Sequence, residues 1–146
     1  MKVALASDHR GIGYKEKVKE LLTRLGHKFA DFGTDKTDSV DYPDYALPAA
    51  RSVASGECDR GIFVCGSGIG MCIAANKVHG IRAALCHNKE TARMSREHND
   101  ANVLCLGADF VAEPLLEEIV STWLETRFGG GRHQRRVCKV MEAEGK

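Results

Sequence analysis

An excess of charge of one sign is what this sequence most plainly lacks. Its 146 residues include 21 Lys and Arg against 20 Asp and Glu, a formal net charge of +1. General nucleic-acid-binding proteins are usually strongly basic, so this balance argues against a nucleic-acid partner. Hydrophobic residues make up 43% of the chain, which is enough for a core and excludes intrinsic disorder. The length predicts a single domain over residues 1–146.

Long apolar runs are also missing. No stretch approaches the roughly 20 apolar residues of a membrane span. The N-terminal apolar run, residues 3–6, is too short for the core of a signal peptide and stops at Asp8. We therefore expect no membrane partner and a cytoplasmic location.

The six cysteines include no C-x-x-C pair, the spacing typical of zinc ribbons and thioredoxin-like redox sites. Most of them lie in apolar runs, as buried free thiols do, so we interpret them as reduced cysteines of an intracellular protein. Five are interpreted as core residues, namely Cys58, Cys72, Cys86, Cys105 and Cys138. Four histidines, His27, His79, His87 and His133, show no metal-ligand spacing.

Short apolar runs alternate with amphipathic stretches along the whole chain. Strands are predicted over residues 2–7, 28–33, 61–65, 81–86 and 103–106. Helices are predicted over residues 14–25, 43–55, 71–77, 89–98, 114–128 and 134–143. This alternation predicts an α/β fold with a five-stranded parallel sheet, helices on both faces and a last, basic helix. Ligands of such sheets bind beyond the carboxyl ends of the strands, which places residues 7–9, 65–70 and 87 at the functional edge.

A glycine-rich turn, Gly66-Ser67-Gly68-Ile69-Gly70, follows the third strand and opens a helix. Exposed N–H groups and a helix N-terminus there favour a bound anion. Met71 stands where a dinucleotide fingerprint needs glycine, so the turn is not a recognisable nucleotide loop. The alternative is a tight strand–helix turn that simply requires small residues.

Cys65 directly precedes this turn. A helix N-terminus favours the thiolate form of a cysteine, which can act as a nucleophile or base. The alternative is one more buried core cysteine. Asp8 and His9 end the first strand and suit hydroxyl binding or proton transfer, but Asp8 can equally cap the next helix.

Two further candidate groups lie late in the chain. His98, beside Asn99, ends a helix and can act as an acid or base, or can interact only with the helix dipole. Arg132 and Arg136 share one face of the last helix and suit a phosphate, although a solvated basic helix is the commoner case.

Six motifs, taken together and in this order, resemble ribose-5-phosphate isomerase type B, in the group that includes galactose-6-phosphate and allose-6-phosphate isomerases. The motifs cover residues 7–9, 41–43, 65–70, 74–77, 95–99 and 130–136. The resemblance implies a Rossmann-like three-layer sandwich with a C-terminal helical extension. It implies interconversion of ribose 5-phosphate and ribulose 5-phosphate without metal or cofactor. It also implies a homodimer or tetramer with shared active sites, segment 129–146 packing on or reaching into a partner subunit.

The resemblance also implies the role of each site residue. Cys65 is the base that moves a proton between C1 and C2, assisted by the Ser67 hydroxyl. His98 opens the sugar ring, assisted by Asp8. The backbone of the turn stabilises the enediolate through Gly66, Gly68, Ile69 and Gly70. The phosphate is bound by His9, Arg132 and Arg136. The sugar hydroxyls contact Tyr42 and Asn99.

The sequence departs from the family pattern at two positions. Asp109 stands where the family commonly has a phosphate-binding arginine, and Arg10 stands where it often has a small or apolar residue. An acid at 109 repels a phosphate if it points inward, and Arg10 is a candidate replacement for the missing charge. The alternative functions are a hexose 6-phosphate isomerase, a non-catalytic sugar-phosphate binder and a nucleotide-binding module that would bind at the 66–70 turn.

Overall fold

The fold is built on one parallel sheet. The structure, a computed structural model, describes residues 1–145. The strands are β1 (Lys2–Ser7), β2 (Lys28–Asp31), β3 (Arg60–Cys65), β4 (Ala83–Leu85) and β5 (Val103–Gly107). They are parallel throughout and lie in the order β2-β1-β3-β5-β4. The α/β class and the five-stranded parallel sheet predicted from the sequence are confirmed.

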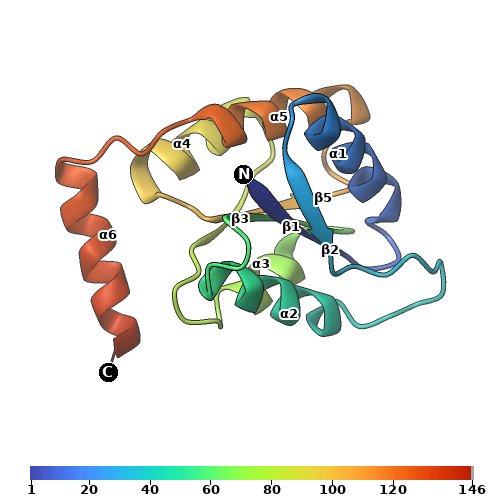
Figure 1. The fold of residues 1–146 in the computed structure, drawn as a ribbon, viewed down its shortest axis with the longest axis horizontal. Helices are drawn as coiled ribbons and strands as arrows, with labels where there is room; N and C mark the ends of the chain where they lie inside the picture. The colour runs from blue at the N-terminus through green and yellow to red at the C-terminus, as the bar shows by residue number, and fades with distance from the viewer. Residues whose placement is uncertain (146) are drawn as a thin grey trace.

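Helices cover both faces of this sheet. They are α1 (Ile12–Arg24), α2 (Pro43–Ala54), α3 (Ile69–Ala75), α4 (Lys89–Asn99), α5 (Glu113–Glu125) and α6 (Arg132–Glu142), followed by the 3-10 turn η1 (Ala143–Gly145). Helices α1, α4 and α5 lie on one face, and α2 and α3 lie on the other (Figure 1). The result is the expected Rossmann-like three-layer sandwich. Among residues 1–145, no helix combines the length and the apolar content needed to cross a bilayer.

Each face of the sheet has its own core. Alternate residues of a strand point to opposite faces, so Val3 and Leu5 pack under α1 and α5, whereas Ala4 and Ala6 face α2. Trp123 of α5 is fully buried in the first core. Each such large apolar side chain contributes about 1.5–3 kcal/mol on burial. The alanines of β1 and α2 let that helix approach the sheet closely.

Several boundaries differ from the prediction because side chains take over backbone hydrogen bonds. Strand β2 ends at Asp31, not residue 33, because the Asp31 carboxylate accepts the Gly33 N–H at 2.9 Å. Strand β4 spans only three residues because the Arg82 N–H donates to Asn102 Oδ1 at 2.8 Å. Helix α5 ends three residues before the predicted residue 128, because Thr126 is extended. Helices α1 and α6 each begin two residues earlier than predicted, and β5 runs one residue further.

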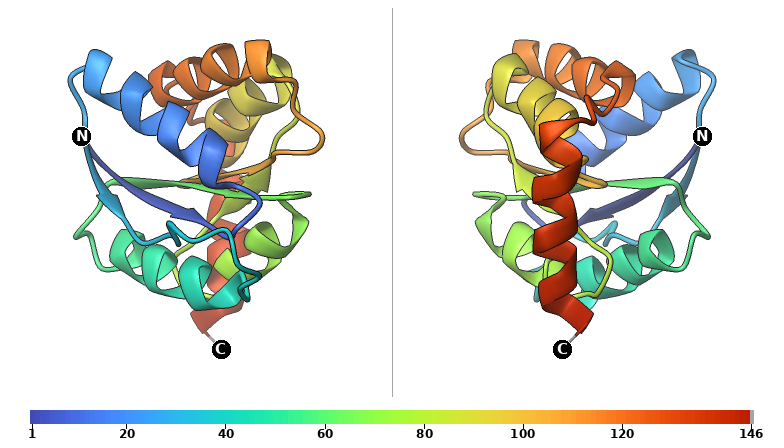
Figure 2. Two further views of the ribbon diagram at one scale, coloured as in Figure 1. Left: turned by 90° about the vertical axis from the view of Figure 1, so that its right-hand side faces the viewer. Right: turned by 90° about the vertical axis from the view of Figure 1, so that its left-hand side faces the viewer.

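Helix α6 stands apart from the layers. It extends beyond one end of the sheet and crosses the level of all three layers (Figures 1 and 2). It packs mainly on α4, Arg82 Nη1 also donates to its Met141 Sδ at 3.4 Å, and Val137 is its buried residue. Val140 on the same helix is 62% exposed. The predicted packing of segment 129–146 on a partner stays a prediction, and its last residue lies outside the described residues.

Candidate active site

The first group of predicted site residues surrounds a cleft at the carboxyl ends of β1 and β3. The chain leaves these neighbouring strands in opposite directions, and such a switch point is where open parallel sheets bind ligands. The cleft measures about 410 Å³. Its lining residues are Asp8, Arg10, Tyr42, Cys65, Gly66, Ser67, Gly70, Asp109 and Phe110. Six of them were predicted as site residues, whereas His9, Gly68 and Ile69 lie beside the cleft without lining it.

Cys65 ends β3 with its thiol turned into the glycine-rich turn. The Gly68 N–H donates to Cys65 Sγ at 3.1 Å, which fixes the position of the sulphur within the turn. Gly68 has φ +77, and a Cβ there would lie 2.8 Å from the Leu106 carbonyl carbon, so this position requires glycine. The buried thiol is thus held at the edge of the cleft.

The amides of the turn are only partly free. The Ile69 N–H donates to Ser67 Oγ at 3.2 Å, and the Gly68 N–H is already bound by the thiol. In this state the cradle predicted over residues 66–70 therefore has two of its amides occupied by side chains of the same turn. The Ile69 side chain itself is exposed to solvent.

Tyr42 and Asp8 form further parts of the wall. A Cβ at Gly70 would lie 2.6 Å from the Tyr42 ring, so the tyrosine packs flush against the glycine backbone. Asp8 is buried, and its Oδ1 accepts the N–H groups of Arg10 at 2.9 Å and Gly11 at 3.3 Å. The carboxylate thus closes the turn before α1, whose N-cap residue Gly11 makes no side-chain cap. Its other oxygen, Oδ2, has no hydrogen-bond partner within residues 1–145.

His9 lies next to this carboxylate with one nitrogen already engaged. The Val40 N–H donates to His9 Nδ1 at 3.2 Å. Because Nδ1 accepts, a neutral His9 carries its proton on Nε2, which is the nitrogen left for a ligand.

The second group of predicted site residues lies at the opposite edge of the sheet. Helix α4 runs back from the carboxyl edge, so His98 and Asn99 at its end lie near the amino ends of the strands. Strands of five to six residues span about 17–20 Å. Helix α6, which carries Arg132 and Arg136, lies at this same edge (Figure 1). One chain therefore does not bring His98, Asn99, Arg132 and Arg136 to Cys65.

Within this second group, the residues share one surface. The ring of His98 stacks on His133 of α6, with centroids 4.3 Å apart and an interplanar angle of 13°. Asn99 and Arg136 line a largely apolar groove of about 450 Å³ between α6 and the β4 edge. The other lining residues of this groove include Ile81, Ala84, Val137 and Val140.

A comparison with known protein families shows which family carries these two groups of residues. The sequence profile of the family described as Ribose/Galactose Isomerase matches residues 3–140. The chain belongs to this family. The resemblance drawn from the six motifs is thereby confirmed, and membership makes the chain an isomerase.

Individual members of the family match over nearly their whole length. The solved structure of Clostridium thermocellum ribose-5-phosphate isomerase B is 54% identical, with a TM-score of 0.97, covering 99% of this chain and 98% of that one. Ribose-5-phosphate isomerase B of Escherichia coli (strain K12) is 45% identical, over 98% of this chain and 96% of the relative. The Mycoplasma genitalium enzyme, solved with bound ribulose-5-phosphate, is 41% identical with a TM-score of 0.96, covering 99% and 97%.

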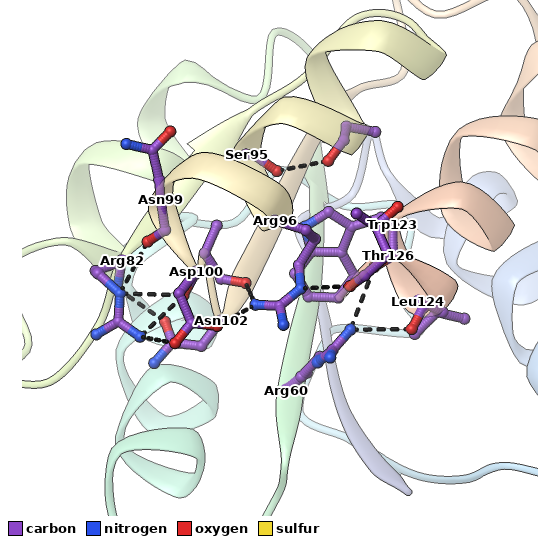
Figure 3. A network of polar contacts seen from close by, with 12 residues as sticks. Arg60, Arg82, Ser95, Arg96, Asn99, Asp100, Asn102, Trp123, Leu124 and Thr126 are labelled. Carbon is purple, nitrogen blue, oxygen red and sulfur yellow. Dashed lines mark hydrogen bonds and ion pairs between the residues drawn. The ribbon is translucent and has the colours of Figure 1, made fainter. Parts of the chain in front are cut away.

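In this family member, an arginine network fixes the backbone that carries His98 and Asn99. Asp100 is left-handed, with φ 47, and is the one non-glycine residue of that kind among residues 1–145. Its carboxylate accepts from Arg96 Nη1 at 2.8 Å and from Arg82 Nη2 at 3.3 Å (Figure 3). Arg82 also donates from Nε to the Asn99 carbonyl at 3.2 Å. The Asn99 side-chain amide points away from the arginines (Figure 3).

Trp123 anchors this network to the core. The guanidinium groups of Arg60 and Arg96 lie 5.4 and 6.0 Å from its ring centroid. Arg60 also donates to the Trp123 carbonyl at 3.2 Å. Burial lowers the pKa of Arg60 to about 10, and the neighbouring Arg96 charge adds to this effect. The end of α4 is thus tied to the first core, although the sequence analysis assigned none of these arginines a role.

The cysteines divide differently from the prediction. Cys58, Cys86 and Cys105 are buried, and Cys72 is half-buried and packs against the second core, but Cys138 is exposed, so the core interpretation is wrong for Cys138. Helix α6 leaves the body, which is why Cys138 finds no core. A hydrogen bond from Cys105 lowers the pKa of Cys72 to about 7 against the opposing effect of burial. Among residues 1–145, no three His, Cys, Asp or Glu side chains gather as metal ligands would.

Proposed function

We propose that this isomerase interconverts D-ribose 5-phosphate and D-ribulose 5-phosphate. The observation that carries the proposal is the Cys65 thiol, held by the Gly68 N–H at 3.1 Å beside Ser67 in the cleft. Family membership and the full-length relatives named ribose-5-phosphate isomerase B support it. The reaction needs a base next to a carbon-bound hydrogen and a site for the oxyanion that forms.

In the proposed step, the Cys65 thiolate takes the proton from C2 of the open-chain aldose. An enediolate forms, and the same proton is returned to C1, while the hydroxyl proton moves from O2 to O1. The hydroxyl of Ser67 is next to this path and assists the oxygen-to-oxygen transfer. The backbone of residues 66–70 stabilises the oxyanion, because the Gly68 and Ile69 amides can exchange their side-chain partners for a stronger, charged acceptor.

Ring opening and phosphate binding need the second group of residues. We infer that His98 and Asn99 of a second copy of the chain meet the Cys65 cleft, together with Arg132 and Arg136. The opposite placement of the two groups on the sheet supports this, since a single chain leaves each group incomplete. In the assembled site, His98 opens the furanose ring with Asp8, and His9 joins the two arginines on the phosphate. Tyr42 and Asn99 contact sugar hydroxyls.

The groove beside α6 supports the same assembly. Its apolar lining includes Val137 and Val140 and lies unpartnered in one chain, as the surface of a homodimer does. A dimer or a dimer of dimers both satisfy this geometry.

The experiment is formation of ribulose 5-phosphate from ribose 5-phosphate by purified protein. Cys65→Ala should lower kcat by at least about 100-fold, because removal of the base leaves only binding and oxyanion stabilisation. Cys58→Ala is the matched control, since Cys58 is a buried cysteine far from the cleft. Full activity of Cys65→Ala refutes the base assignment.

The alternative functions can be distinguished by whether the protein turns over a sugar phosphate and by whether it prefers a pentose or a hexose. A hexose 6-phosphate isomerase shows a higher kcat/KM on allose 6-phosphate than on ribose 5-phosphate. A non-catalytic binder binds either sugar phosphate without turnover. Asp109, which motivated the binder, is paired with Arg10, so its charge does not stand alone in the cleft.

A further inference from the structure

Arg10 and Asp109 face each other across the mouth of the cleft. Their side chains form an ion pair, Arg10 Nη2 donating to Asp109 Oδ2, and both line the cleft beside Cys65 and Ser67. The guanidinium lies against the glycine-rich turn, because a Cβ at Gly66 would be 3.0 Å from Arg10 Cζ. A cation is therefore held directly over the turn that precedes α3.

The backbones that carry this pair are fixed relative to the turn. The Arg10 N–H donates to Asp8 Oδ1 at 2.9 Å. The Asp109 N–H donates to the Gly66 carbonyl at 3.0 Å. Each side chain therefore reaches the cleft from an anchored position on a different strand end, after β1 and after β5.

The charges of the cleft make Arg10 distinctive. Within residues 1–145, the lining contains the carboxylates of Asp8 and Asp109 and a single guanidinium, that of Arg10. A sugar phosphate brings up to two negative charges into this space. Arg10 is the one cation that this chain itself places in the cleft lining to meet them, in addition to the arginines that a second copy brings, and guanidinium groups bind phosphate oxygens in a fork.

The pair is weak enough to exchange partners. The side chains of Arg10 and Asp109 are 56% and 44% exposed, and exposed ion pairs contribute little net free energy. We propose that Arg10 binds the phosphate of the substrate, and that Asp109 is its competing partner, holding the guanidinium over the empty cleft. This assignment rests on the proposed function, because it takes a sugar phosphate as the ligand.

The test uses two single variants. Their effects on KM show whether the ion pair is merely structural or whether Asp109 competes with the phosphate for Arg10. Arg10→Gln should raise KM for ribose 5-phosphate by about 10-fold with kcat little changed, since it removes a charged contact. Asp109→Asn should lower KM by about two- to fivefold, because it frees the guanidinium from a surface-type pair. A merely structural ion pair predicts that both variants raise KM, and that result overturns the proposal.

A matched ion pair controls for surface charge. Lys17 and Glu113 join α1 to α5 with comparable exposure but line a different surface. Lys17→Gln and Glu113→Gln should leave KM unchanged. Shifts in KM of the same size as those of the cleft variants overturn the proposal, because they show a general charge effect.

Calorimetric titration with inorganic phosphate separates this proposal from the proposed function. Absence of ribose 5-phosphate turnover by the wild-type protein refutes the proposed ribose 5-phosphate reaction but leaves the binding measurement intact. Phosphate affinity should then still fall about 10-fold in Arg10→Gln and rise in Asp109→Asn. Equal affinity in wild type and Arg10→Gln, or no phosphate binding by the wild type, overturns the proposal.

Discussion

The separation of Cys65 and His98 on opposite edges of the sheet predicts complementation between two inactive variants. The central strands of five to six residues span about 17–20 Å, so these residues meet only if they come from different copies. Cys65→Ala lacks the base and His98→Gln lacks the ring-opening acid. Each variant alone should therefore have almost no activity on ribose 5-phosphate.

Mixing the two inactive variants should restore a share of the wild-type activity that can be calculated. When equal amounts of the two variants assemble at random, about half of the dimers are mixed. In a mixed dimer, one site combines the intact Cys65 of one chain with the intact His98 of the other, and the second site has neither. The mixture should reach about a quarter of wild-type activity.

The assay co-refolds the two variants from denaturant and measures ribulose 5-phosphate formation at constant total protein. The control is the double variant Cys65→Ala/His98→Gln, mixed with an equal amount of wild type. Its mixed dimers have no intact site, so the wild-type chains should lose about half their activity. No rescue in the first mixture, together with no loss in the second, refutes a site shared between copies.

Three further predictions concern folding and thiol chemistry. Asp100→Ala should lower the free energy of unfolding more than Asp100→Gly, by about 1 kcal/mol in urea titrations, because φ 47 disfavours alanine. Desolvation lowers the pKa of His133, and the nearby His98, Arg132 and Arg136 lower it further. The unfolded state therefore binds more protons than the folded state in this pH range, and the free energy of unfolding should fall as the pH drops below about 6.5. His133→Gln should lose that dependence in the same titrations at pH 7.5 and 5.5. Alkylation of Cys72, followed by mass spectrometry, should have its midpoint near the pKa of about 7, and Cys105→Ala should move it upward.

Each of these has a result that contradicts it. Equal stability of the alanine and glycine variants shows that position 100 is not strained. A wild-type pH profile matching that of His133→Gln removes the histidine stack as its cause. An unchanged alkylation midpoint in Cys105→Ala shows that its thiol does not set the ionisation of Cys72.

The fold was predictable because it depends on a pattern that repeats along the chain. Apolar runs such as 61–65 alternate with amphipathic helices, and this alone implies a parallel sheet with two covered faces. Boundaries depend on single side-chain contacts. The strand predicted over residues 81–86 includes Arg82, yet the Arg82 N–H bonds to Asn102, twenty positions away, and β4 begins at Ala83, two residues later than predicted.

The candidate site was predictable only in part, for a related reason. Cys65, Asp8 and the glycine-rich turn follow strands directly, so the topology alone places them at one edge. Pairs formed by residues far apart in the chain leave no local signal. The contact between Arg10 and Asp109 spans 99 positions, and the sequence presented them only as two isolated departures from a pattern.

The Asp100 network was missed because its signal is conformational. Aspartate is tolerated in left-handed backbone, but nothing in the run 96–100 indicates that this residue adopts it. Arg96 is 6% exposed and bonds to the Ala101 carbonyl at 2.7 Å, although arginine is a residue type that is mostly exposed. The sequence signal that could have indicated this network is the group of arginines near the end of a helix that is followed directly by a strand.

The placement of helix C-termini at the far edge of the sheet has a consequence for how catalysis is organised. Many enzymes close a mobile loop over each substrate and spend binding energy on that ordering in every turnover. In the proposed two-copy site, the second wall arrives with another folded molecule, and Asp100 and its arginines have already fixed its shape. The entropy of bringing acid and base together is then lost once, when the subunits associate, and every later substrate enters a site whose groups are in place.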